Sequence, residues 1–153
     1  MSSTTIALFE QNPDHAAALR AMLAHFPTLT VHTFSDAEEM LQDSGHVDVY
    51  VLGLDDLGPE ETDLLARLRA THAGSLAGIA LCSAQSEDEL VNAFEAHDFD
   101  SFVSKDWVSS AQMYLAVTAA LRSARWRLNH KCAVHGMTNL RCGSPISFAE
   151  AAE

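Results

Sequence analysis

The sequence predicts an α/β fold in which a doubly wound parallel sheet carries helices on both of its faces. Short apolar segments alternate with longer segments of helical period, and the apolar segments are hydrophobic at nearly every position. Strands of that kind belong to parallel sheets that are covered on both sides. The 153 residues, 48% of them hydrophobic and 20% charged, suit one globular domain of this class.

The first two strand–helix units precede residue 43. Strands are expected at residues 5–9 and 29–33. Asn12 or Asp14 can cap the helix that follows the first strand and runs through residue 26. The apolar positions of this helix recur at helical spacing and are Ala17, Ala18, Met22 and Phe26. Ser35 or Asp36 can cap the short helix that follows the second strand.

Three further units complete the pattern. Strands are expected at residues 47–52, 78–82 and 99–104, and the helices that follow them at 60–70, 86–96 and 109–128; the short helix of the second unit is expected at 37–42. Residues 53–59 are expected to form a loop. Ser86 has Glu89 three residues later, which is the capping-box spacing. Ser109 or Ser110 can cap the last and longest helix.

Five such units predict the flavodoxin-like arrangement, with strand order 2-1-3-4-5. In this arrangement ligands bind at the carboxyl ends of the strands, near the point between the first and third strands where the winding reverses. The candidate site residues are therefore those that follow the strands, at positions 10–12, 53–56, 83–84 and 105–106.

Residues 4–125 resemble the receiver domains of two-component response regulators, of the chemotaxis-regulator type. In receivers the first strand ends in two acidic residues that hold magnesium; here Glu10 matches the first and Gln11 replaces the second. The third strand of receivers ends in the aspartate that accepts a phosphoryl group, and Gly53 occupies that position.

The other two strand ends keep the residue types of receivers. Ser83, followed by alanine, matches the hydroxyl residue after the fourth strand. Phe102 and Lys105 match the aromatic switch residue and the lysine of the fifth strand, although Asp106 stands where a proline usually follows. Phe102 is expected to pack on the last helix, and its role as a switch is implied by the resemblance alone.

The resemblance implies a degenerate phosphorylation pocket. Phosphoryl transfer to an aspartate needs that carboxylate as the nucleophile and a divalent cation to neutralise charge, and glycine supplies no nucleophile. One carboxylate beside a neutral amide binds magnesium weakly, because hard cations favour anionic oxygen. We therefore expect a pseudo-receiver that signals by docking on proteins without aspartyl phosphorylation. It is not expected to be an enzyme or to hold a cofactor.

One alternative is a residual phosphoacceptor at Asp55, two residues beyond Gly53. On a continued strand Asp55 would face the same side, about 6–7 Å further along. The other interpretation places Asp55 and Asp56 in a solvated turn. Lys105 is expected to form an ion pair with Glu10 or Asp55, or to extend into solvent.

The charge is strongly negative and unevenly distributed. The net charge is −12, which disfavours nucleic acid as a partner. Residues 1–121 contain 19 acidic and four basic residues, whereas residues 122–153 contain two acidic and five basic ones. No apolar run is long enough to cross a membrane, and the N-terminus does not resemble a secretory signal, so a cytoplasmic location is expected.

The last fifth of the chain differs from the rest, and we divide the chain into a receiver-like domain at residues 1–128 and a C-terminal extension at 129–153. Trp126, among arginines, has the composition of an interface anchor, or alternatively folds back on the body and caps the core. The expected docking surface comprises the fourth helix, fifth strand and last helix, and it carries Phe102, Trp107, Tyr114 and Trp126. Its partner would be a histidine kinase, another regulator or a second copy, which would give a homodimer.

A second alternative is a metal- or redox-responsive regulator. The candidate ligands are His130, Cys132, His135 and Cys142, but their spacing lacks a second standard ligand pair, so zinc is not expected. Cys82 lies in an apolar strand and is expected to be a small core residue with a reduced thiol.

Overall fold

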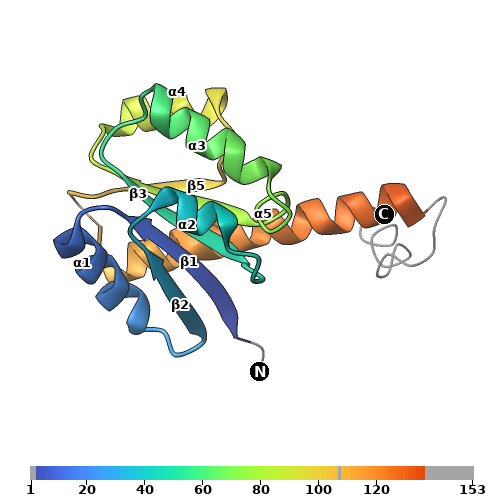
Figure 1. Cartoon of the computed structure of the whole chain (residues 1–153), viewed down its shortest axis with the longest axis horizontal. Coiled ribbons are helices and arrows are strands. Elements are labelled where there is room, and N and C mark those ends of the chain that lie inside the picture. The colour runs from blue at the N-terminus through green and yellow to red at the C-terminus, as the bar shows by residue number, and fades with distance from the viewer. Residues whose placement is uncertain (1–2, 107, 137–153) are drawn as a thin grey trace.

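The computed structural model describes residues 3–106 and 108–136, and for residues 131–136 it describes the backbone. One parallel sheet with strand order β2-β1-β3-β4-β5 forms its centre (Figure 1), as predicted. The strands are β1 (Thr4–Glu10), β2 (Leu29–Phe34), β3 (Val49–Leu54), β4 (Gly78–Ser83) and β5 (Ser101–Ser104). The helices are α1 (Pro13–Ala24), α2 (Ala37–Gln42), α3 (Pro59–Ala70), α4 (Glu87–Ala96) and α5 (Ser110–Gly136).

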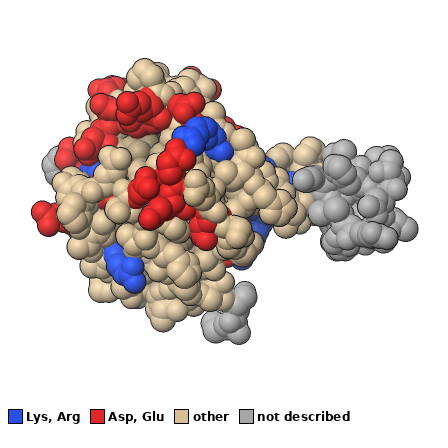
Figure 2. Space-filling model, viewed as in Figure 1, with Lys and Arg blue, Asp and Glu red and all other residues tan. Residues whose placement is uncertain are grey.

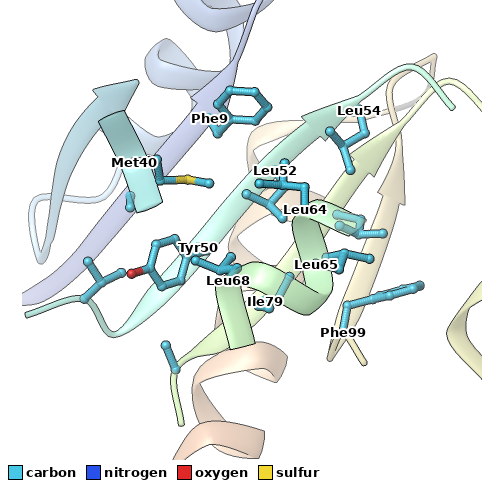
Figure 3. Packing of buried hydrophobic residues seen from close by; sticks show 14 residues of the cluster. Phe9, Met40, Tyr50, Leu52, Leu54, Leu64, Leu65, Leu68, Ile79 and Phe99 are labelled. Atoms are coloured by element: carbon cyan, nitrogen blue, oxygen red, sulfur yellow. The ribbon is translucent and has the colours of Figure 1, made fainter. Parts of the chain in front are cut away.

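Alternate residues of each central strand face opposite layers of helices. In β3, Val49 and Val51 pack with Leu19 and Leu23 of α1 and with the first half of α5. Tyr50 and Leu52 face the other way and pack with Met40, Leu64, Leu65 and Leu68 of α2 and α3 (Figure 3). Both faces of the sheet are therefore covered, which explains why the strands read as continuous apolar runs.

The helix caps follow the predicted pattern. Asn12 accepts hydrogen bonds from the amides of Asp14 and His15, and Asp36 accepts one from Glu38. The Ser86 hydroxyl accepts a hydrogen bond from the Glu89 amide at 3.3 Å and donates to its carboxylate at 3.1 Å. These local bonds fix where the helices begin, because they satisfy amides that have no partner within the helix.

The prediction was wrong in several details, among them the third strand and the inner face of α1. The third strand spans Val49–Leu54, not residues 47–52, because it keeps pairing partners on both sides as far as Gly53, which lies opposite Glu10 and Cys82. In α1 the buried residues are Leu19 and Leu23, whereas Ala17 and Ala18 are exposed. The leucines have more apolar surface to bury than the alanines, so they set the inner face of the helix.

The last helix extends past residue 128, where it was expected to end, and continues to Gly136. The predicted boundary between the two segments of the chain thus falls inside α5. Its second half projects beyond the sheet (Figure 1). Within the described ranges, no helix combines the length and apolar character that a bilayer crossing requires.

Candidate functional site

The carboxyl ends of β1, β3 and β4 and the residue after β5 meet at one edge of the sheet. Glu10, the last residue of β1, lies opposite Gly53 of β3 in the strand register. Lys105 follows β5, and its amide donates to the Ser83 carbonyl at 2.8 Å. Parallel pairing therefore brings together five of the residues that were predicted to form the pocket: Glu10, Gly53, Asp55, Ser83 and Lys105.

Lys105 is at the centre of the site and forms two ion pairs. Its Nζ lies 2.7 Å from Glu10 Oε2 and 2.9 Å from Asp55 Oδ1. The side chains of Lys105 and Glu10 are 10% and 4% exposed, so this pair is withdrawn from water. Burial by itself lowers the pKa of Lys105, but hydrogen bonds to Glu10 and Asp55 outweigh it and raise the pKa above its ordinary value. The expected ion pair is confirmed, and it includes both of the carboxylates that were considered.

Asp55 approaches Lys105 from the outside. Its side chain is 77% exposed, and the hydrogen bond from Lys105 lowers the pKa of this carboxyl. The backbone carbonyl of Asp55 accepts a hydrogen bond from the Ser83 hydroxyl at 3.4 Å. Ser83 is fully buried, and its hydroxyl also accepts a hydrogen bond from the Gln85 amide at 3.2 Å. The hydroxyl therefore bonds to backbone groups on either side of the site.

His15 also belongs to the site and was not singled out from the sequence. Its Nδ1 lies 3.3 Å from Lys105 Nζ. Its position in the first turn of α1, directly after the carboxyl end of β1, was the available signal.

A cavity of about 640 Å³ opens beside this group of residues, between the ends of β1 and β3 and the start of α3. Gln11 lines it and is exposed. Its acidic lining residues are Glu10, Asp55, Asp56, Glu60, Glu61 and Asp63. Acidic side chains gather on the face shown in Figure 2.

The residues present do not fit a magnesium ion held in the manner of receivers. Glu10 Oε2 is paired with Lys105, and Oε1 accepts a hydrogen bond from the Asn12 amide at 3.1 Å. Gly53 offers no carboxylate. In the part of the chain that the structure describes, no three Asp, Glu, His or Cys side chains are grouped so that they could hold a metal.

No protein-family model matches the sequence, and no curated protein matches it either. Solved structures do match. The signal receiver domain of an HD domain-containing protein from Pseudomonas fluorescens is 22% identical, with a TM-score of 0.65 over 81% of this chain and 98% of that one. A CheY-like receiver domain from Methanospirillum hungatei is 15% identical, with a TM-score of 0.65 over 82% and 99%.

A third structure shows the same similarity with a metal bound. The receiver domain of a sensor histidine kinase from Pseudomonas aeruginosa, solved with magnesium in its active-site cleft, is 15% identical to this chain. Its TM-score is 0.66 over 79% of this chain and 99% of that one. This chain has the receiver fold. The resemblance inferred from the strand ends is confirmed at the level of the fold.

Within this receiver fold, two aromatic residues of the expected docking surface pack against neighbouring aromatic rings. The Phe102 ring packs with Phe94 and Phe99, at centroid distances of 6.1 and 6.4 Å, so it lies under α4 and not on α5 as predicted. The Tyr114 ring packs on Phe26, 4.3 Å away, beside the end of α1. Trp107 lies outside the described residues.

Trp126 is 59% exposed, so the interpretation in which it caps the core was wrong. It stacks on His130, one helical turn later, with ring centroids 5.0 Å apart. His130 is therefore engaged with an aromatic ring. The side chains of Cys132 and His135, and Cys142 altogether, lie outside the described residues.

Proposed function

We propose that the protein is a pseudo-receiver: a signalling protein that acts in a two-component type of pathway by docking on other proteins, without aspartyl phosphorylation. One observation carries the proposal. The receiver fold is complete, yet the position of the phosphoacceptor is Gly53, and the lysine of the pocket is already paired with Glu10 and Asp55. No enzymatic role is proposed, and the cytoplasmic location stays a prediction from the sequence.

Exposed apolar side chains support docking as the output. On α4 these are Val91 and Phe94, which are 47% and 44% exposed. On α5 Leu115 and Trp126 are 67% and 59% exposed. A groove of about 350 Å³ runs along β5 between these helices and is lined by Phe102, Val103 and Leu115. Exposed apolar patches of this kind mark interaction sites.

The partner that these features favour is a second copy of the chain. Leu115, Ala119, Arg122 and Trp126 lie at helical spacings of four, three and four, so they share one face of α5. All four are exposed. The basic residues after position 121 complement the acidic body, which has a net charge of −15. A histidine kinase or another regulator remains the alternative occupant of this surface.

The test is intact-mass spectrometry after incubation with magnesium and acetyl phosphate. We expect no phosphoryl adduct on the wild-type chain. A receiver domain that is readily phosphorylated by acetyl phosphate, treated in parallel, controls for the activity of the reagent.

The ion pair between Asp55 and Lys105 favours a second candidate, a residual phosphoacceptor at Asp55, since this carboxylate is ionised, exposed and held beside the lysine. An adduct that Asp55→Asn abolishes would overturn the pseudo-receiver proposal and establish this second function. An adduct that survives Asp55→Asn would exclude Asp55 as the acceptor, and its location on another aspartate would overturn the pseudo-receiver proposal as well.

A further inference from the structure

Gly53 lies where any side chain would collide with Glu10. A Cβ placed on Gly53 would lie 2.9 Å from Glu10 Cδ and closer still to Oε2. Gly53 is inside β3 and has no left-handed φ, so its backbone does not require glycine. The requirement is one of space, and the atoms that impose it belong to the Glu10 carboxylate.

The two oxygens of that carboxylate are held in this position, one by an ion pair and the other by a hydrogen bond. Oε2 pairs with Lys105 Nζ at 2.7 Å, and Oε1 accepts the Asn12 amide at 3.1 Å. The Glu10 side chain is 4% exposed, and a buried carboxylate without a partner is strongly disfavoured. Glu10 is therefore anchored across the face of Gly53 by its own contacts.

We propose that the Glu10 carboxylate is the built-in occupant of the pocket, filling the space of a side chain on β3 and holding Lys105 in one permanent position. This inference rests on the proposed function, and it explains what holds the pocket in one conformation. A residue of β1 takes the place that a carboxylate on β3 would occupy. The pocket therefore has one state, fixed by the sequence.

The position of Lys105 gives this arrangement a consequence for docking. Lys105 directly follows β5, the strand that lines the groove between α4 and α5. Its amide is tied to β4 and its side chain to β1 and to the loop after β3. These contacts of Lys105 thus fix the end of the docking groove, and no covalent modification of the pocket is needed.

A double-mutant cycle between Gly53 and Glu10 tests the proposal. In the wild type, Gly53→Ala should push the Glu10 carboxylate away from Lys105 and lower the Tm by about 5 °C. In a Glu10→Ala background the carboxylate atoms that collide are gone, and the Cβ of residue 10 remains 3.3 Å from the added Cβ. The same change should then leave the Tm unchanged or raise it by about 2 °C, because alanine is better than glycine inside a strand.

Two variants distinguish the steric effect of the Glu10 side chain from the effect of its charge, and from the general effects of replacing a glycine. Glu10→Gln keeps the size of the side chain, so Gly53→Ala should still lower the Tm in that background. Gly45→Ala places a Cβ 3.5 Å from Asp43, in ordinary contact, and should behave alike in every background. The 15N resonance of the Lys105 side chain should shift with Gly53→Ala as it does with Glu10→Ala. It should not shift with Gly45→Ala.

Equal effects of Gly53→Ala in the wild-type and Glu10→Ala backgrounds would overturn the proposal, as would an unmoved Lys105 resonance. If Glu10→Ala does not fold, the comparison of Gly53→Ala with Gly45→Ala by the Lys105 resonance decides the matter. These results are independent of the proposed function. A phosphoryl adduct on Asp55 would refute phosphorylation-independent signalling and leave the cycle intact, whereas an additive cycle without an adduct would refute only the built-in occupant.

Discussion

Arg127 binds Asp100 with two nitrogens of its guanidinium, Nη1 to Oδ1 at 2.6 Å and Nη2 to Oδ2 at 3.1 Å. Asp100 is 7% exposed at its side chain, precedes β5 and also accepts from Arg69 at 3.0 Å. Arg127 further donates to the carbonyl of Ala77 at 2.7 Å. A buried carboxylate between two arginines thus ties the projecting half of α5 to the amino-terminal edge of the sheet.

This relationship predicts that Arg127→Met destabilises the protein by about 2 kcal/mol, because it removes one partner of a largely buried ion pair and leaves Arg69 as the other. Urea unfolding measures the change. Arg125→Met is the matched control, since Arg125 is exposed on the same helix, and it should change stability by less than about 0.5 kcal/mol. Equal effects of the two substitutions would show that Arg127 does not anchor α5.

The proposed homodimer predicts that Trp126→Ala lowers the mass in solution from twice 16.6 kDa towards the single-chain value. Removal of a large exposed aromatic anchor weakens an interface most. Sedimentation equilibrium measures the mass. Leu128→Ala is the control, because Leu128 is also exposed but points about 200° away around α5, and it should leave the mass unchanged. A wild type that is already a monomer would contradict the dimer.

The pKa of Lys105 predicts a loss of stability at alkaline pH. Since the folded pKa lies above the ordinary value of 10.5, the contribution is complete below pH 10.5 and is lost as the pH rises through the folded value. The slope is up to about 1.4 kcal/mol per pH unit. Urea unfolding between pH 9 and pH 11.5 measures it.

Two other buried groups, Tyr50 and Cys82, also stabilise the folded state less as the pH rises through this range, because burial raises the pKa of each to about 12. The measurement therefore uses a Tyr50→Phe, Cys82→Ala background, with and without Lys105→Arg. Arginine stays charged throughout, so Lys105→Arg should flatten the remaining alkaline slope. An unchanged slope would show that Lys105 does not stabilise the folded state by its charge.

Burial raises the pKa of the Cys82 thiol to about 12 and leaves the side chain without exposed surface. Because the thiolate is the reactive form, Cys82 should not be alkylated by iodoacetamide in the native protein, and should react after unfolding in urea. Intact-mass measurement on the Cys132→Ser, Cys142→Ser variant isolates this thiol. Rapid native labelling would show that the Cys82 thiol is accessible in the folded protein.

The sequence was sufficient for the sheet order and the helix caps, because both follow from local patterns along the chain. It also indicated that Lys105 would pair with Glu10 or Asp55. What it could not predict depends on distant side chains. The direction of Phe102 towards α4 and of Tyr114 towards Phe26, and the reach of Arg127 to Asp100, are decided by packing between elements.

Gly53 shows the same limit more sharply. The sequence alone shows that position 53 lacks a carboxylate. The close approach of Glu10 to this position is seen only when β1 and β3 are paired.

That relation also constrains how such a pocket can change over generations. A carboxylate cannot enter position 53 while Glu10 covers it, and Glu10 cannot leave without loosening Lys105. Each single step therefore passes through a less stable intermediate, so the two positions are epistatic. Across descendants of this sequence, an acidic residue at position 53 should appear together with a shorter residue at position 10.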